Sequence, residues 1–375
     1  MTQTYVNETQ AMIADSAQRL FGDHVTRKQL DAFEEGAWPR DLWGLSAQSG
    51  FASALASESA GGIGASWADV YPLLRAIGYW QVPLPLGETL LGAWLLSRAG
   101  LDVPDVSQGP ITVIEQDRGN ALSLTRGAGG GVQVDGPASG VPWARAARWI
   151  VVSGRVDGQP TLVLVDREQA GDAKVSLTVR ENLAKEPRDD LHFHAVSSAA
   201  AVPLPAGIAQ PVWTLGALLR CVAMVGALES ALDQSVRYAN ERVQFGRPIG
   251  GNQAIQQSLA MLAGEVAAAR MATQVAVASA PGMSADDGGT TLFDVAVAKV
   301  RCGEAASKAT SIAHQVHGAI GFTYEHALHY ATRRLWSWRA EFGSDAQWAE
   351  RLGAAAIDAR AAGFWAGLTD RALVR

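Results

Sequence analysis

Apolar positions recur with two different periods along the chain, and the change of period divides the chain into parts. From Glu8 to Gly100 they recur every three or four residues, as Ile13 and Ala17 do, and this spacing predicts amphipathic helices. Pro39 and Pro72 are expected near helix starts, where a missing backbone N–H is tolerated. The first hundred or so residues are therefore expected to form a helical domain.

The middle of the chain has a different pattern. Between Pro110 and Pro203, short runs of β-forming residues are separated by Gly, Asp and Pro, which predicts strands joined by turns. These runs are Ile111–Ile114, Trp149–Val152 and Leu162–Val165. We expect this segment to be a β domain.

After Pro211 the helical period returns and continues to the C-terminus, interrupted by a Gly-rich break at Gly282–Gly289. One long helix is indicated by an apolar stripe made of Leu218, Val222, Val225, Leu228, Leu232 and Val236. Such a stripe must be covered by other helices. We therefore expect an α+β fold that is mainly α, with a helical N-terminal domain (1–108), a middle β domain (109–205) and a C-terminal four-helix bundle domain (206–375).

Composition excludes some classes of protein. The 375 residues are 48% hydrophobic and 18% charged, a balance typical of folded globular domains. A net charge of -6 offers no basic surface for nucleic acid. The two cysteines, the absence of a signal-peptide pattern and the shortness of the uninterrupted apolar stretches favour a soluble protein of the cytoplasm, not one of the membrane.

Two motifs in the C-terminal part resemble those of a known family. Residues Tyr238–Ile249 (YANERVQFGRPI) resemble the signature of the acyl-CoA dehydrogenase family, and Gln315–Phe322 (QVHGAIGF) resembles its second FAD-binding segment. The loop Ser57–Ser66 also resembles a loop of the family's N-terminal domain. The likeness extends from about Phe33 to Gly353, and its domain order agrees with the order derived from periodicity.

The resemblance implies FAD as cofactor and assigns residues to it. A helix that ends at Gly246–Pro248 would deliver Arg242 and Gln244 to a subunit surface, where a guanidinium can bind a pyrophosphate with two hydrogen bonds. By the same likeness, Phe245 lies against the cofactor and Gln253 hydrogen-bonds its adenosine part.

The second segment would let its backbone approach the FAD of a neighbouring subunit. Gln315, Gly318 and Ala319 are the residues implied, and alanine replaces the second glycine that the family usually has at 319. The resemblance also implies a cofactor contact at Ser344. Two His-x-x-His pairs, at 314/317 and 326/329, are read as polar packing, because no third cluster of ligands accompanies them, so no metal is expected.

Enzymes of this family remove the α-proton of an acyl-CoA with a glutamate while the β-hydride passes to the flavin. In one family location for that glutamate this chain has Phe342, preceded by Glu341, which is the candidate base. In the other location it has Gly216. The β domain also lacks the family's Thr-Glu-Pro and Trp-Ile-Thr stretches, which contact the flavin ring.

Such losses are similar to those in heteromeric members of the family, found among bacterial enzymes that degrade steroid side chains, in which only one of two related chains brings the carboxylate. The first hypothesis is an FAD-dependent acyl-CoA dehydrogenase of lipid metabolism, a homo- or hetero-oligomer that passes electrons from an acyl-CoA to an electron-transfer flavoprotein. The alternatives are a non-catalytic partner subunit of such an enzyme and a relative with another flavin reaction.

Overall fold

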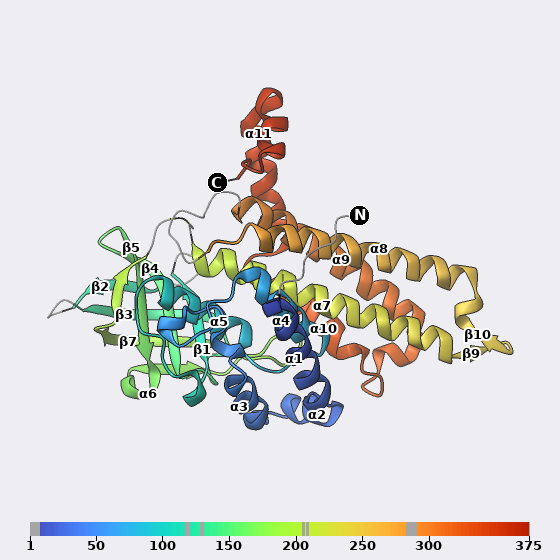
Figure 1. The fold of residues 1–375 in the computed structure, drawn as a ribbon, viewed down its shortest axis with the longest axis horizontal. Coiled ribbons are helices and arrows are strands. Elements are labelled where there is room, and N and C mark those ends of the chain that lie inside the picture. The colour runs from blue at the N-terminus through green and yellow to red at the C-terminus, as the bar shows by residue number, and fades with distance from the viewer. Residues whose placement is uncertain are drawn as a thin grey trace.

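The computed structural model describes residues 8–116, 121–127, 131–204, 207, 210–282 and 291–374. A group of short helices at the N-terminus is followed by two β-sheets and then by a long helical bundle (Figure 1). The predicted α+β, mainly α fold is confirmed. The division into three domains stays a prediction, although helices give way to strands between Gln108 and Ile111 and strands give way to helices between Pro203 and Pro211.

The N-terminal helices have local signals that set their ends. Their bounds are α1 Glu8–His24, α2 Arg27–Glu34, α3 Arg40–Gln48, α4 Trp67–Tyr79 and α5 Leu86–Arg98, with short 3-10 turns η1 Phe51–Ser53, η2 Glu58–Ala60 and η3 Val106–Gln108. Pro39 is the N-cap of α3, as expected. Pro72 was expected near a helix start, which is wrong, because a capping box between Ser66 and Asp69 begins α4 earlier. The carbonyl of Ala68, which Pro72 leaves without its helical donor, accepts a hydrogen bond from the Gln10 side chain at 2.9 Å.

Two four-stranded sheets form the middle part. The first has the strand order β1-β4-β5-β8 and the second β2-β3-β7-β6. Their bounds are β1 Ile111–Glu115, β2 Ser123–Arg126, β3 Val132–Pro142, β4 Trp149–Val156, β5 Gln159–Asp166, β6 Val175–Thr178, β7 Arg188–Ser198 and β8 Ala201–Pro203, with the short helix α6 Arg167–Ala170 after β5. Strands β1 and β4 are parallel, and the other pairs are antiparallel.

Alternation along β1 divides the apolar interior into two cores. Ile114 joins the core between the sheets, which includes Phe193, whereas Ile111 and Val113 join the larger core that the helices share. The first sheet is therefore covered on one face by the second sheet and on the other by helices. This arrangement holds the end of β1 against the bundle.

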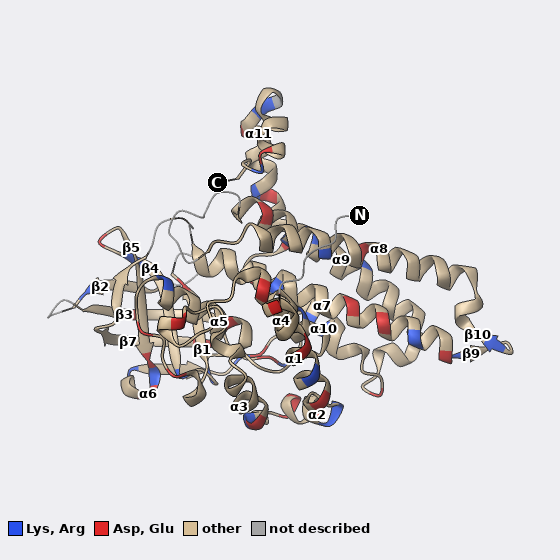
Figure 2. Ribbon diagram, in the orientation of Figure 1, with Lys and Arg blue, Asp and Glu red and all other residues tan. Residues whose placement is uncertain are grey.

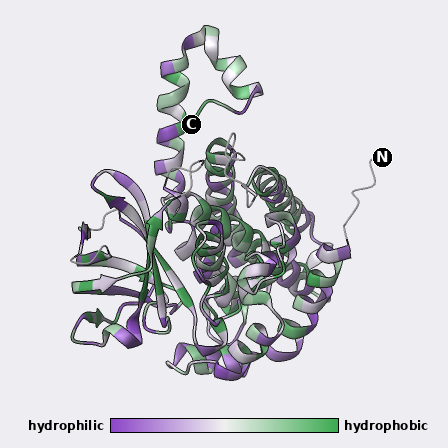
Figure 3. Ribbon diagram, turned by 60° about the vertical axis from the view of Figure 1, so that its left-hand side comes forward, coloured by the Kyte–Doolittle hydropathy of each residue, from purple (hydrophilic) through white to green (hydrophobic). Residues whose placement is uncertain are grey.

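The bundle is built around its longest helix. Its helices are α7 Pro211–Glu241, α8 Gln253–Ala278, α9 Thr291–His317, α10 Leu328–Trp338 and α11 Asp345–Thr369. Helix α7 is apolar and long enough to cross a membrane by length and composition, but 89% of its most apolar window is buried inside the protein. It is therefore placed as a core helix. Helix α11 leaves the bundle and projects from the body (Figures 1 and 3).

The connection from α7 to α8 differs from the prediction. Helix α7 ends at Glu241 and not at Gly246–Pro248, because the chain turns extended at Arg242. A small hairpin follows, in which β9 Val243–Gln244 pairs with β10 Arg247–Pro248, and the 3-10 turn η4 Ile249–Gly251 leads into α8. Residues 283–289 of the predicted Gly-rich break lie outside the described residues.

Candidate functional site

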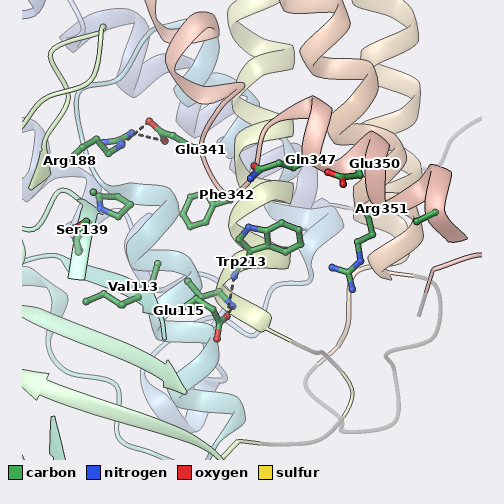
Figure 4. A pocket seen from close by; sticks show the side chains of 17 residues that line it. Val113, Glu115, Ser139, Arg188, Trp213, Glu341, Phe342, Gln347, Glu350 and Arg351 are labelled. Carbon is green, nitrogen blue, oxygen red and sulfur yellow. Dashed lines mark hydrogen bonds and ion pairs between the residues drawn. The ribbon is translucent and has the colours of Figure 1, made fainter. Parts of the chain in front are cut away.

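A cleft of about 820 Å³ opens where the β domain meets the N-terminal end of α7. The end of β1, part of β3, the turn between α10 and α11 and the first turns of α11 line it (Figure 4). The Glu115 carboxylate accepts hydrogen bonds from the backbone N–H groups of Val212 and Trp213 at 3.0 and 3.2 Å. Glu115 thus provides acceptors for N–H groups of the first turn of α7, which lack partners within the helix, and places a negative charge at the positive end of the helix dipole.

Glu341, the predicted base, lies at this cleft but is held by other side chains. Arg188 donates to both carboxylate oxygens at 2.8 Å, Arg220 donates at 2.6 Å and Asn182 at 3.0 Å. Burial by itself would raise the pKa of the Glu341 carboxyl, but the two guanidinium groups outweigh it and lower the pKa to about 2. A carboxylate with so low a pKa is a poor proton acceptor near neutral pH, so the geometry gives no support to Glu341 as the base.

These ion pairs belong to a larger buried cluster, which we call the charge cluster. Its members are Glu88, Glu186, Arg188, Arg220, Arg334 and Glu341. Acids and arginines are equal in number, so the cluster is neutral overall. A cavity of about 20 Å³ lies against it, between α4, α5 and α7, and a space of this size holds about one water molecule.

The two positions at which the resemblance predicts the family's glutamate, 342 and 216, meet in space. The ring of Phe342 lies against Gly216, so closely that a Cβ at Gly216 would be 2.5 Å from the ring. The Arg220 guanidinium lies 5.3 Å from the centre of the same ring. Phe342 and Gly343 both have positive φ, 51° and 88°, which makes the sharp turn into α11. The two locations thus form one site, occupied by an aromatic ring and a glycine.

Most of the residues predicted to bind FAD lie at the other end of α7. Arg242, Gln244, Phe245 and Gln253 are exposed on or beside the β9–β10 hairpin at the tip of the bundle (Figure 1), and Figure 2 shows positive charge at that tip. The Arg242 side chain has no hydrogen-bond or ion-pair partner among the described residues. A guanidinium that is free to bind an anion fits the pyrophosphate of FAD.

Phe245 has an unusual conformation at the turn of this hairpin. Its side chain is fully exposed, at 102%, and its φ is +52°. The conformation and the exposure are both unfavourable for phenylalanine within a single chain. A non-glycine residue kept in such a state is typical of a binding surface.

The second predicted segment lies beside the hairpin. Gln315, near the end of α9, and Gly318 and Ala319, in the 3-10 turn η5 Gly318–Phe322, are all exposed. Tyr238, one turn before Arg242, stacks on His317 with ring centres 4.6 Å apart, which brings the two motifs together. The structure thus unites seven of the eight cofactor candidates at one end of the bundle, as a predicted binding surface.

Ser344 is the exception. Its hydroxyl caps α11 by accepting from the backbone of Gln347, at the cleft end of α7. The 31 residues of α7 separate the two ends by roughly 45 Å. One cofactor molecule therefore cannot lie against Arg242 and in the cleft of the same chain.

Sequence reasoning missed Arg188, Arg220 and Glu88, which control the cleft end. Arg220 and Glu88 each interrupt a run of apolar residues, and a charge at such a position signals a buried partner. Arg188, at the start of β7, carried no comparable signal. Among the described residues, no group of three or more His, Cys, Asp or Glu side chains is arranged to hold a metal ion.

Comparisons with known proteins agree with the fold and the motifs. The family model of the acyl-CoA dehydrogenase N-terminal domain matches residues 7–102, and the model of the C-terminal domain matches residues 207–362. The acyl-CoA dehydrogenase IpdE2 of Mycolicibacterium smegmatis is 28% identical over 334 residues, covering 88% of this chain and 93% of that protein. The acyl-CoA dehydrogenase FadE27 of Mycobacterium tuberculosis is 29% identical over 320 residues, covering 81% and 84%.

Solved structures share the whole architecture. A chain of the ChsE4-ChsE5 complex of M. tuberculosis superposes with a TM-score of 0.83 at 24% identity, covering 95% of this chain and 99% of that one. A chain of the steroid acyl-CoA dehydrogenase Tcur3481-Tcur3483 superposes with a TM-score of 0.82 at 26% identity, covering 94% and 99%. The two family models together match more than half of the chain, which therefore belongs to the acyl-CoA dehydrogenase family of FAD-dependent oxidoreductases that act on acyl-CoA thioesters.

Proposed function

We propose that this chain is the subunit of a heteromeric acyl-CoA dehydrogenase that completes the FAD site of a related partner subunit and does not itself supply the catalytic base. The single observation that carries this proposal is the contact of Phe342 with Gly216. These two residues hold both places where the family's glutamate is expected, and neither can accept a proton.

The charge cluster supports the same role. Glu341 lines the cleft of about 820 Å³, but its carboxylate is engaged by two guanidinium groups and is not free to accept a proton. Glu341, on the turn next to Phe342, therefore stabilises the folded structure at the cleft end of α7. In this proposal it orients Arg188 and Arg220 and takes no part in proton transfer.

The bundle tip supports a contribution to another chain's cofactor. Arg242 and Gln244 would hold the pyrophosphate, Phe245 and Gln253 would contact the remainder of the dinucleotide, and the backbone at Gly318 would approach it closely. The chemistry that bound FAD supplies is acceptance of the β-hydride of the acyl-CoA. Because these residues lie far from the chain's own cleft, they serve a cofactor that is shared with a second subunit.

Finer features of the assembly follow the same proposal. The M. tuberculosis complex and the Tcur3481-Tcur3483 enzyme named above are each composed of two different chains, which makes a related chain the expected partner here. We further propose an electron-transfer flavoprotein as electron acceptor, a cytoplasmic location, and a soluble assembly without nucleic acid.

Producing the chain alone and together with a related chain of the same genome that retains a glutamate at either family location tests the proposal. Alone, the chain should be colourless and inactive towards acyl-CoA. Together, the two chains should co-purify as a yellow complex with one FAD for each pair of chains. A stable yellow homo-oligomer of this chain that dehydrogenates acyl-CoA would overturn the proposal.

A further inference from the structure

Four histidines surround the turn that joins α9 to α10, beside the second cofactor motif. His317 packs edge-on against His326, with ring centres 4.5 Å apart, and stacks on Tyr238. His314 stacks on Phe322 at 4.4 Å, and His329 packs against Tyr330 at 4.0 Å. Tyr238 also packs edge-on against His326 at 6.0 Å, and Tyr324 against His329 at 5.1 Å. We call these ring contacts, which join residues 318–327 to α7, α9 and α10, the histidine latch.

One hydrogen bond of the latch requires an uncharged imidazole. His326 Nδ1 accepts a hydrogen bond from the backbone N–H of Leu328 at 3.1 Å, at the first residue of α10. His317 Nδ1 donates to the Ala313 carbonyl at 2.8 Å, and its Nε2 is buried without a partner among the described residues, so a proton taken up at Nε2 would find no acceptor there. Protonation of His326 would replace the acceptor at Leu328 by a donor and place a cation at the positive end of α10.

The surroundings of the latch are already positively charged. The cations that face it are Arg27 on α2, Arg237 on α7 and Arg333 on α10. The Arg27 guanidinium donates to the carbonyls of Tyr324 and Glu325 at 2.6 and 2.7 Å. Two nearby carboxylates on α2 are engaged, since Glu34 pairs with Arg333 and Asp31 accepts from the Tyr330 hydroxyl and pairs with Arg27. The carboxylate of Glu325, next to His326, is exposed.

Burial reinforces this preference for neutral rings. It lowers the pKa of His317 from 6.5 to about 4 and, together with the charges of His329, Arg27 and Arg237, lowers that of His326. A lowered folded-state pKa means that the latch contributes stability above pH 6.5 and loses it as the pH falls from about 6.5 towards about 4.

We propose that the segment Gly318–Ala327 is a proton-sensitive latch, closed while the imidazoles of His317 and His326 are neutral and opened when they take up protons. The opening breaks the bond to Leu328 and separates two rings that would both carry positive charge. It concerns this chain alone and needs no cofactor. Because Gly318 and Ala319 lie in the same segment, the latch would also control the grip on the shared FAD, a consequence that rests on the proposed function.

Hydrogen exchange of the full chain, followed from about pH 7.5 to about pH 4.5, tests the latch. After correction for intrinsic exchange rates, amides of residues 318–328 should lose at least about tenfold in protection at the acid end, the factor that one pKa unit supplies. The His326→Asn variant retains an acceptor for the Leu328 N–H but does not titrate, so its segment should keep its protection. His192→Asn, in an exposed imidazole pair of the β domain, is the matched control and should behave as the unmodified chain.

Two results would overturn the latch. One is a parallel loss of protection in the unmodified chain and in both His326→Asn and His317→Phe, the second variant keeping a stacking ring. The other is titration of His326 at or above 6.5 in side-chain NMR. In the assembled enzyme, FAD release that is unaffected by acid while the exchange result holds would leave the latch intact and count against the proposed shared FAD site instead.

Discussion

The two ends of α7 differ in how their polar groups are satisfied. At the cleft end, Glu341, Arg188 and Arg220 satisfy one another inside the chain, and Phe342 fills the space beside Gly216. At the bundle tip, Arg242 and Phe245 are exposed, and neither has a partner that satisfies it within the described residues. The charges at the cleft end are therefore satisfied inside the chain, whereas Arg242 and Phe245 stay exposed at the end that the proposed function assigns to another subunit.

A substitution in the charge cluster should give the largest loss of stability. Glu341→Gln removes the carboxylate that Arg188 and Arg220 share, so the buried cluster keeps three arginines against only Glu88 and Glu186. We expect this unbalanced buried charge to lower the free energy of unfolding by about 3–5 kcal/mol in urea titrations. Glu350→Gln, an exposed residue of the same cleft, should stay within about 0.5 kcal/mol. An assembled enzyme that keeps its stability but loses turnover on Glu341→Gln would instead identify Glu341 as the base.

The pH dependence of unfolding should separate the cluster from ordinary carboxylates. Because the pKa of Glu341 is lowered from 4.5 to about 2, its contribution to stability is present above pH 4.5 and is lost as the pH falls to about 2. Removing the carboxylate should therefore flatten the stability curve in this range. Equal slopes for the unmodified chain and Glu341→Gln would contradict the ion pairing.

A substitution at the bundle tip should weaken FAD binding without changing the free energy of unfolding. Arg242→Ala removes a charge-assisted contact worth about 1.5–3 kcal/mol, so the assembled enzyme should bind FAD about ten- to a hundredfold more weakly. Its free energy of unfolding as a single chain should not change, since the side chain is exposed. Flavin fluorescence measures the release. Arg247→Ala on the same hairpin is the control. An equal loss of FAD affinity in this variant would mean that the effect comes from the positive charge of the hairpin and not from a specific contact of Arg242.

Substitutions that change side-chain volume can test the contact between Gly216 and Phe342. Gly216→Ala would place a Cβ 2.5 Å from the Phe342 ring and should destabilise the chain by about 1–3 kcal/mol. Replacing the ring by a smaller side chain, in the double variant Gly216→Ala/Phe342→Leu, should recover part of the lost stability. Gly264→Ala is the matched helical control, because no described atom lies within 4 Å of its Cβ, and alanine there should stabilise α8 by up to about 1 kcal/mol. Equal effects at both glycines would contradict the contact.

Some of the site could be predicted from local sequence. The motifs around Arg242 and Gln315 identified the family and the cofactor, whereas the family location at Phe342, predicted by counting along the chain, stays a prediction. The end of α7 was misplaced, because residues 242–248 form a hairpin whose turn has positive φ at a phenylalanine, which no propensity favours. The direction of Glu341 could not be foreseen either, since it depends on which side chains surround it.

The sequence by itself determined the order of helices and strands, the family, and the absence of a carboxylate at the two predicted positions, 216 and 342. These are properties of spacing and of residue type, which are local. Only the tertiary structure decided that Glu341 is paired and that Phe342 meets Gly216, because the partners come from elements 121 to 153 residues away in the chain. It also decided that most of the predicted FAD contacts lie far from the cleft, since the length of α7 separates two groups of residues that a linear reading assigns to one site.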